Sequence, residues 1–167
     1  KKGLITVEES NIYSFKNLKT KKYDLDNFVK KNVKFREGFL EFYKHLINNN
    51  LDFKIVSSGV DFYIYSALAS LNIDPESVEI ISGKSTFNSL GIDVQYFDPE
   101  NYKINTNFKG IHTAFHKQKY SRIIYFGDSY TDLNSASISD VIFATDKLQK
   151  YYDKKGVDHF PFENYFE

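Results

Sequence analysis

The chain has 167 residues, enough for one domain with a single sizeable core and too few for two. Its 22 basic and 22 acidic residues cancel, so the composition gives no sign of binding to nucleic acid or to an anionic membrane, which an excess of clustered Lys and Arg would indicate. The absence of cysteine excludes disulfides and thiol chemistry, and it fits the cytoplasmic protein that we expect. No apolar run approaches the ~20 residues of a membrane span.

The first 33 residues lack the alternation of strands and helices that marks the rest of the chain. Within them, Gly3–Glu9 is compatible with a strand or with the start of a helix. Asp24–Lys31 is predicted to be a helix capped by Asp24. We expect residues 1–33 to form part of a helical cap on the domain made by residues 34–167.

From Phe35 onward, helical and strand patterns alternate with short connections, which is typical of βα units in a mainly parallel sheet. Helices are predicted at Arg36–Asn49, Asp61–Leu71, Thr106–Lys117, Thr131–Ser137 and Asp146–Lys155, the last one ended by Gly156. Strands are predicted at Phe53–Val56, Val78–Ile81, Arg122–Phe126 and Val141–Ala144, with a hairpin on the sheet edge over Phe87–Pro99, interrupted by Gly91. The expected fold class is therefore α/β, with a three-layer Rossmann-like core.

Two carboxylates follow the clearest buried strand. Arg122–Phe126 leads into Gly127 and Asp128, and Asp132 comes four residues after Asp128. Ligands of open parallel sheets bind outside the carboxyl ends of the strands, and Gly127 allows a tight turn there. A carboxylate pair at this place suits Mg²⁺, which prefers oxygen ligands. The spacing alone fits equally well a helix start, with one aspartate as the N-cap and the other in the first turn.

Two further positions have the chemistry of a phosphate site. Ser57, followed by Ser58 and Gly59, comes directly after a predicted buried strand and before a helix, where hydroxyl, free amides and helix N-terminus favour a phosphoryl group. Lys109 lies in the first turn of a predicted helix, and its cation can neutralise charge on a transferring phosphoryl group. Lys103 competes for this role. Each signal is weak by itself, because Ser and Gly end many strands and most lysines are surface residues.

Taken in order, these segments resemble three of the four motifs of the haloacid dehalogenase superfamily. The matching segments are Ile55-Val56-Ser57-Ser58-Gly59, Lys109-Gly110 and Gly127-Asp128-Ser129-Tyr130-Thr131-Asp132. Flanking segments such as Phe35-Arg36-Glu37-Gly38-Phe39 and Phe160-Pro161-Phe162 make the chain most similar to phosphoserine phosphatases and to the phosphatase of the methionine salvage pathway. The resemblance covers Phe35 to the end of the chain.

This resemblance implies an Mg²⁺-dependent hydrolase that acts on the phosphate monoester of a small metabolite and passes through an aspartyl-phosphate. It implies that Asp128 and Asp132 serve the metal, with the orientation of Lys109 as the other role open to Asp132. Ser57 and Lys109, with Ser58 and Gly59 beside them, would hold the phosphoryl group. The expected catalytic residues are Ser57, Lys109 and Asp132.

The remaining motif of this superfamily is the first in chain order, an Asp-x-Asp nucleophile pair on a strand ahead of the others. It has no clear match in this sequence. Asp24-Leu25-Asp26 has the letters but follows Lys21-Lys22-Tyr23 instead of a buried strand, and Leu4–Glu9 has an apolar start without the aspartates. We therefore expect residues ahead of Lys1, or a second chain, to supply the nucleophile strand. The sheet should have a gap where this strand belongs, and the 167 residues alone should have little or no activity.

Two other functions fit parts of the sequence. Phe126–Asp132 also looks like the serine block of GDS-type esterases, with Ser129 as nucleophile and Asp158-His159 completing a triad. That family, however, carries this block near its start, whereas roughly three quarters of this chain precedes Ser129. The other alternative is an inactive, phosphate-binding relic that lacks the nucleophile altogether.

Overall fold

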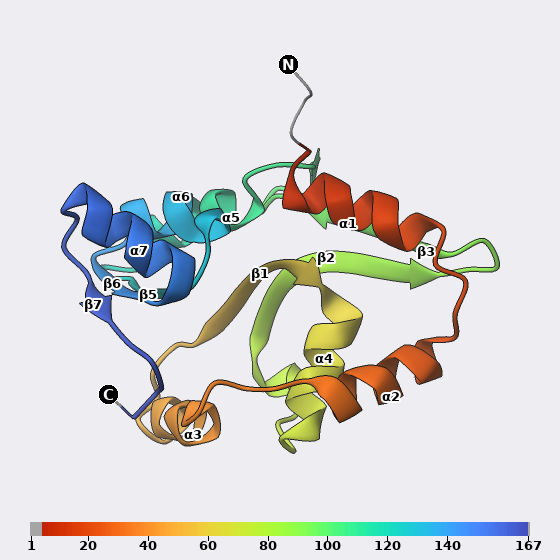
Figure 1. The fold of residues 1–167 in the computed structure, drawn as a ribbon, viewed down its shortest axis with the longest axis horizontal. Coiled ribbons are helices and arrows are strands. Elements are labelled where there is room, and N and C mark those ends of the chain that lie inside the picture. Colours follow the sequence, from red (N-terminus) through yellow and green to blue (C-terminus); the bar gives the residue numbers. More distant parts are fainter. Residues whose placement is uncertain (1–4, 167) are drawn as a thin grey trace.

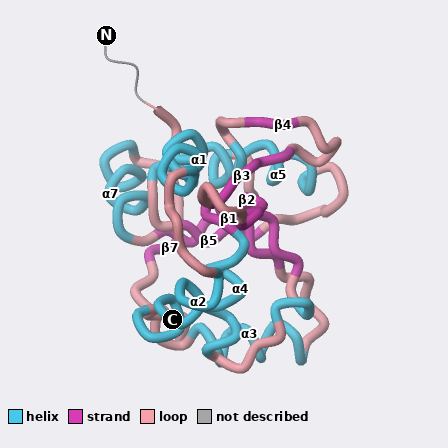
Figure 2. Tube along the Cα trace, turned by 90° about the vertical axis from the view of Figure 1, so that its right-hand side faces the viewer, coloured by secondary structure: helices cyan, strands magenta, loops and turns pink. Residues whose placement is uncertain are grey.

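The structure, a computed structural model, describes residues 5–166. Its strands form a central layer with helices on both faces, as Figure 1 and Figure 2 show. On one face lie α1 (Val7–Lys16), α5 (Phe108–Lys117), α6 (Leu133–Ser137) and α7 (Asp146–Lys155), and on the other lie α2 (Lys22–Asn32), α3 (Phe39–Asn48) and α4 (Asp61–Ser70). The predicted three-layer α/β class is confirmed.

The strands form two separate sheets. In the first, β1 (Lys54–Val60) is parallel to β2 (Glu79–Phe87), and β3 (Ile92–Phe97) and β4 (Lys103–Ile104) continue it in antiparallel fashion. The second holds the parallel strands β5 (Ile124–Gly127), β6 (Val141–Ala144) and β7 (Phe160–Pro161). Within residues 5–166, β1 and β5 each pair with a strand on one side only. This break agrees with the gap that the sequence predicts.

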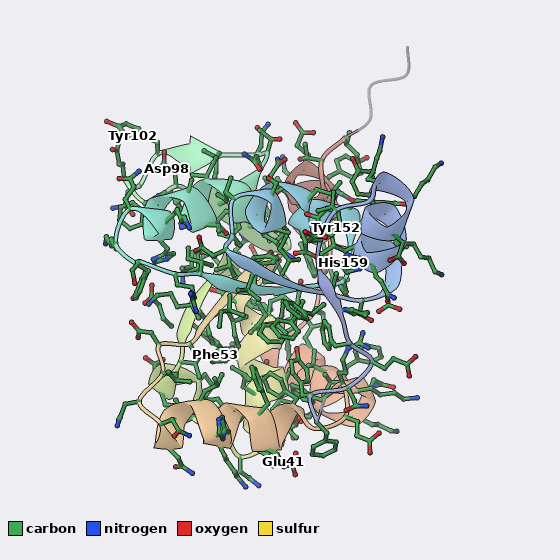
Figure 3. All side chains as sticks on the ribbon, turned by 90° about the vertical axis from the view of Figure 1, so that its left-hand side faces the viewer. Glu41, Phe53, Asp98, Tyr102, Tyr152 and His159 are labelled. Carbon is green, nitrogen blue, oxygen red and sulfur yellow. The ribbon has the colours of Figure 1, made fainter. Side chains whose placement is uncertain are left out.

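Aromatic side chains from α3 connect the two sheets on one face. The ring centroid of Phe42 lies 6.4 Å from that of Phe53, just ahead of β1, and 5.2 Å from that of Phe126 on β5. Figure 3 shows Phe53 between α3 and the strand layer. Tyr165, near the end of the chain, stacks on Phe42 at 4.9 Å, and Phe126 stacks on Phe143 of β6 at 4.6 Å. Such pairs each contribute about 0.5–1.5 kcal/mol beyond burial of their area, so the two sheets are fixed relative to each other without a shared ladder.

Residues at or near the helix termini explain where several helices begin and end. Thr6 and Glu9 form a capping box at the start of α1, where Glu9 N donates to Thr6 Oγ1 and Thr6 N donates to the Glu9 carboxylate. Gly156 ends α7 as predicted, with a φ of +64° that favours glycine. The predicted Asp24 cap is wrong, because α2 begins at Lys22 and places Asp24 in its first turn, where a negative charge is still favourable.

The first two helices pack directly on the sheet and on α4. Ile12 and Phe15 of α1 and Leu25 of α2 contact the core cluster that contains Val60 and Phe62. Whether residues 1–33 form a separate cap therefore stays a prediction, and Gly3 and Leu4 of the predicted first element lie outside the described residues. Within residues 5–166, no helix combines the length and the apolar character that crossing a membrane requires.

All predicted helices and strands of the domain are present, with ends that shift by up to three residues, as where α3 begins at Phe39 instead of Arg36. Three differences are larger. β1 continues through residues 57–59 to Val60, where the sequence predicts a loop. β2 reaches Phe87 because it forms a hairpin with β3 around Gly91. The predicted helix over residues 131–137 is a short 3₁₀ helix, Tyr130–Asp132, followed by α6.

Candidate active site

Asp132 is buried, and protein donors occupy both of its carboxylate oxygens. Oδ1 accepts hydrogen bonds from Lys109 Nζ at 2.6 Å and from Tyr125 Oη at 2.7 Å. Oδ2 accepts from the backbone amides of Asp128 at 3.1 Å and Ser129 at 2.9 Å, and from Ser129 Oγ at 3.1 Å. Asp132 therefore fixes Lys109 on α5 and the loop after β5 at the same time.

These contacts keep Asp132 ionised. Burial alone raises its pKa, but the charge of Lys109 and the hydrogen bonds from Lys109 and Tyr125 outweigh burial, so that the pKa of Asp132 lies below its ordinary value. Burial, with the charge of Asp132 beside it, raises the pKa of Tyr125 strongly, so the phenol keeps its proton and donates it. The Lys109 ammonium therefore faces a charged carboxylate, with side chains 15% and 2% exposed.

The Asp128 backbone is held on both sides, while its side chain is exposed. Its amide donates to Asp132, and its carbonyl accepts from Lys147 N at 2.9 Å and Leu148 N at 3.2 Å. Gly127 is required here for a reason other than the predicted tight turn, since its φ is not positive. A Cβ at Gly127 would lie 2.9 Å from Asp132 Cβ and 2.9 Å from Leu148 Cδ2. Gly127 thus allows the close approach of Asp132.

The geometry fits one carboxylate ligand for a hard cation, whereas the sequence predicts two. No hydrogen bond or ion pair within residues 5–166 engages the Asp128 carboxylate, whereas both Asp132 oxygens already accept from protein donors. In the same range, no three His, Cys, Asp or Glu side chains gather into a metal site. Mg²⁺ is usually held by one or two carboxylates with phosphate and water, and of the two aspartates Asp128 is the one whose exposed carboxylate fits such a ligand.

Ser57 and its neighbours form an irregular segment inside β1. The pairing with β2 is regular up to Val56 and resumes at Val60, so that residues 57–59 lie opposite Ser82 alone. This bulge removes the polar groups of residues 57–59 from the regular ladder, as bulges near active sites often do. Gly59 N donates to Ser57 Oγ at 3.0 Å. The Ser57 hydroxyl keeps its own proton for another acceptor.

Glu8, which belongs to none of the predicted motifs, links this segment to α5. It is 5% exposed, and its Oε1 accepts from Ser58 Oγ at 3.1 Å and from Phe108 N at 3.2 Å. Phe108 is the first residue of α5 and precedes Lys109. The three predicted motifs are thereby brought together in one hydrogen-bonded network. The sequence around Glu8 offers one indirect signal. The capping box explains why a glutamate stands at position 9, and it leaves the glutamate at position 8 without a role in the helix start.

The alternative serine triad is not formed. Ser129 Oγ contacts Thr131 Oγ1 at 2.7 Å and Asp132 Oδ2 at 3.1 Å. His159 packs on Tyr152, with ring centroids 5.7 Å apart, and its Nε2 lies 3.4 Å from Asp153 Oδ1. Figure 3 places His159 and Tyr152 side by side. Across residues 5–166, no histidine contacts Ser129, so nothing activates this hydroxyl as an esterase nucleophile.

The Asp24-Leu25-Asp26 segment lies in helix α2, on the face of the sheet opposite α5 and α6 (Figure 1). Asp26 pairs with Lys22 at 2.8 Å and accepts from Ser66 Oγ at 2.6 Å. It therefore holds α2 against α4. This agrees with the expectation that the segment is no nucleophile motif.

Comparisons with known proteins agree with these motifs. The family profile described as pyrimidine 5′-nucleotidase (UMPH-1) matches residues 12–153. A 2-hydroxy-3-keto-5-methylthiopentenyl-1-phosphate phosphatase of Bacillus velezensis is 31% identical over 151 residues, which make up 87% of this chain and 62% of the relative. A protein of the same name from Bacillus cereus is 28% identical over 168 residues, 98% of this chain and 75% of the relative.

Among solved structures, cytosolic 5′-nucleotidase IIIB bound to cytidine superposes with a TM-score of 0.65 at 19% identity, over 96% of this chain and 58% of that one. This likeness shows a shared fold. The chain spans 62% of the Bacillus velezensis relative and 58% of the solved nucleotidase. The expected resemblance to haloacid dehalogenase-type phosphatases is confirmed. The chain belongs to the UMPH-1 pyrimidine 5′-nucleotidase family of these phosphatases.

Proposed function

We propose that the protein hydrolyses a phosphate monoester of a small metabolite in an Mg²⁺-dependent reaction that passes through an aspartyl-phosphate. The observation that carries this proposal is the continuous network that runs from Ser58 through Glu8 to α5, and from Lys109 through Asp132 to the amide of Asp128. It joins the proposed anion-binding segment, a fixed cation and an exposed carboxylate, which are the parts other than the nucleophile that the proposed phosphoryl transfer uses.

We propose one role for each of these side chains. The Ser57 hydroxyl donates to a phosphoryl oxygen, with Ser58 and Gly59 beside it, and the Lys109 ammonium neutralises charge that develops on the phosphoryl group. Asp132 positions Lys109, because both of its oxygens are engaged by the protein. Asp128 holds the metal. Mg²⁺ bound there supplies positive charge that stabilises the phosphoryl oxygens.

The gap between β1 and β5 is the place for the nucleophile strand. Within residues 5–166, both strands have an unpaired edge, and both have their carboxyl ends at the proposed site, β1 with residues 57–60 and β5 with Gly127. A parallel strand that pairs with these two edges brings its carboxyl end between Ser57 and Asp128. Residues ahead of Lys1, or a second chain, supply this strand and its nucleophilic aspartate in the proposal.

The substrate class follows from what the relatives share. Pyrimidine 5′-nucleotides and the methylthiopentenyl phosphate named for the Bacillus proteins are both phosphate monoesters of small organic molecules. We propose this class for the present protein, acting in the cytoplasm. The inactive, phosphate-binding relic is the alternative, and a coding sequence without an apolar strand and Asp-x-Asp ahead of Lys1 would favour it.

The test compares the natural full-length protein with the 167-residue chain on a panel of small phosphate monoesters, with Mg²⁺ and with a chelator. We expect Mg²⁺-dependent turnover by the full-length protein and little or none by the 167 residues. Asp26→Asn in the full-length protein is the matched control and should keep its turnover, because Asp26 serves α2 and α4. Strong turnover by the 167 residues would place the nucleophile among them, and an inactive full-length protein would support the relic.

A further inference from the structure

The peptide group between Ser58 and Gly59 is held by side chains from α1 and β3. Its carbonyl oxygen accepts from Asn11 Nδ2 at 2.8 Å and from Tyr96 Oη at 2.7 Å. Asn11 Nδ2 also donates to Tyr96 Oη at 2.8 Å, so the three groups form a closed triangle. Because the bulge takes this carbonyl out of the regular β1–β2 ladder, the two side chains replace the partner that a buried carbonyl needs.

The other end of the same peptide group contacts the proposed phosphate ligand. Gly59 N–H donates to Ser57 Oγ at 3.0 Å. A peptide group is planar, so a fixed direction of the Ser58 carbonyl also fixes the direction of the Gly59 N–H. Since the Ser57 oxygen accepts from Gly59, its remaining proton is confined to directions away from that bond. The side chains that hold the carbonyl therefore set the direction of the Ser57 hydroxyl.

We propose that Asn11 and Tyr96 are positioning residues, which orient the Ser57 hydroxyl toward the phosphoryl group through the Ser58–Gly59 peptide. This inference rests on the proposed function, because it gives Ser57 a phosphoryl group to bind. It extends that function to α1 and β3, which lie outside the three motif segments. Neither residue touches the reacting groups, and both act through one peptide plane.

The packing of the core explains why an aromatic ring stands at position 96, but it does not explain why this ring carries a hydroxyl group. The ring lies against Gly83, where a Cβ would come within 2.7 Å of Tyr96 Cζ, and it meets the ring of Phe108 edge-on at 5.1 Å. A phenylalanine would make the same contacts. Burial raises the pKa of Tyr96, so the hydroxyl stays protonated and donates to the Ser58 carbonyl. The variant Tyr96→Phe thus removes the proposed role while it keeps the packing.

A double-mutant cycle in the natural full-length protein tests this role. Tyr96→Phe, Ser57→Ala and the double variant are compared by kcat/KM for a small phosphate monoester with Mg²⁺, and by calorimetric titration with inorganic phosphate. We expect Tyr96→Phe to lower kcat/KM and phosphate affinity about threefold to tenfold, the size of one hydrogen bond. In the Ser57→Ala background the same change should have less than about a twofold effect.

Tyr13→Phe is the control, because Tyr13 lies on the same helix as Asn11 and is 74% exposed. It should leave both readouts unchanged. Effects of Tyr96→Phe and Ser57→Ala that multiply in the double variant would overturn the proposal, since they would show that Tyr96 acts independently of Ser57. If Tyr96→Phe does not fold, Asn11→Ala takes its place in the same cycle. A full-length protein without turnover would contradict the proposed function, and the phosphate titration would still decide the role of Tyr96.

Discussion

Lys109 Nζ lies 2.6 Å from Asp132 Oδ1, and this ion pair joins α5 to the loop after β5. Both side chains are largely removed from water, so their mutual attraction must offset a large desolvation cost. Further donors make this arrangement stable, because Tyr125 and Ser129 also bind the Asp132 carboxylate. The Lys109 ammonium is therefore held at one place instead of moving as a surface lysine does.

Replacing Asp132 by Asn should destabilise the fold by about 3–5 kcal/mol, because the buried Lys109 charge is left without a counter-charge. Asp128→Asn changes an exposed carboxylate and should alter the free energy of unfolding by at most about 0.5 kcal/mol. Urea unfolding followed by circular dichroism measures both. In the full-length protein both variants should lose turnover. Equal stability of the two would contradict the buried pair, and unchanged turnover of Asp128→Asn would contradict the metal role.

Acid should weaken the fold through Asp132. Its pKa is lowered in the folded state, so the ionised carboxylate contributes stability that is present above its unfolded pKa of about 4. That stability is lost as the pH falls through the lower, folded pKa. We expect the free energy of unfolding to fall more steeply below about pH 4 in the wild type than in Asp132→Asn. Parallel pH profiles would show that Asp132 is not the group responsible.

Ser129→Ala separates the phosphatase from the esterase. The change removes one of three donors to Asp132 Oδ2 and leaves the two backbone amides in place. We expect a loss of about 1 kcal/mol in stability, near-normal turnover of p-nitrophenyl phosphate by the full-length protein, and no hydrolysis of p-nitrophenyl acetate before or after the change. An acetate-ester activity that disappears in Ser129→Ala would restore the serine nucleophile.

Gly127→Ala tests whether close approach, and not backbone freedom, requires this glycine. The added methyl group would meet Asp132 Cβ and Leu148 Cδ2 at 2.9 Å, so we expect a loss of about 1–3 kcal/mol from overpacking together with reduced turnover. Gly156→Ala is the matched control: it has open space but a φ of +64°, so it should cost about 1 kcal/mol and leave turnover unchanged. Thermal unfolding and full-length activity distinguish the two variants.

The sequence predicts most of the fold because its signals are local. An apolar run such as that of β6 and a terminal glycine such as Gly156 are recognised from neighbouring residues alone, and the structure confirms the strand and the helix end. The same holds for the placement of Lys109 in the first turn of α5. These features need no knowledge of tertiary contacts.

The remaining parts of the site depend on contacts between distant residues. Glu8 binds groups that are 50 and 100 positions away in the chain. From the sequence alone it cannot be distinguished from the adjacent Glu9, which belongs to a capping box. The sequence of residues 57–59 is compatible with a strand end and with a bulge. Pairing with β2, which is distant in the chain, determines that it forms a bulge. Spacing alone also leaves both roles of Asp132 open, metal ligand or partner of Lys109, because the donor Tyr125 cannot be recognised from spacing.

The break between the two sheets has a consequence for folding cooperativity. Each sheet has its own buried cluster, one around Ile92 and Phe108 and the other around Leu148 and Tyr152. Within residues 5–166, side chains such as Phe42 connect the sheets, and no backbone ladder does. Regions that are joined by side chains and not by a ladder are separate units in amide exchange, so the 167 residues should lose their amide protection in two steps. A strand that closes the gap would merge these steps into one, so that the hydrogen bonds which complete the active site also make the domain unfold as a single unit.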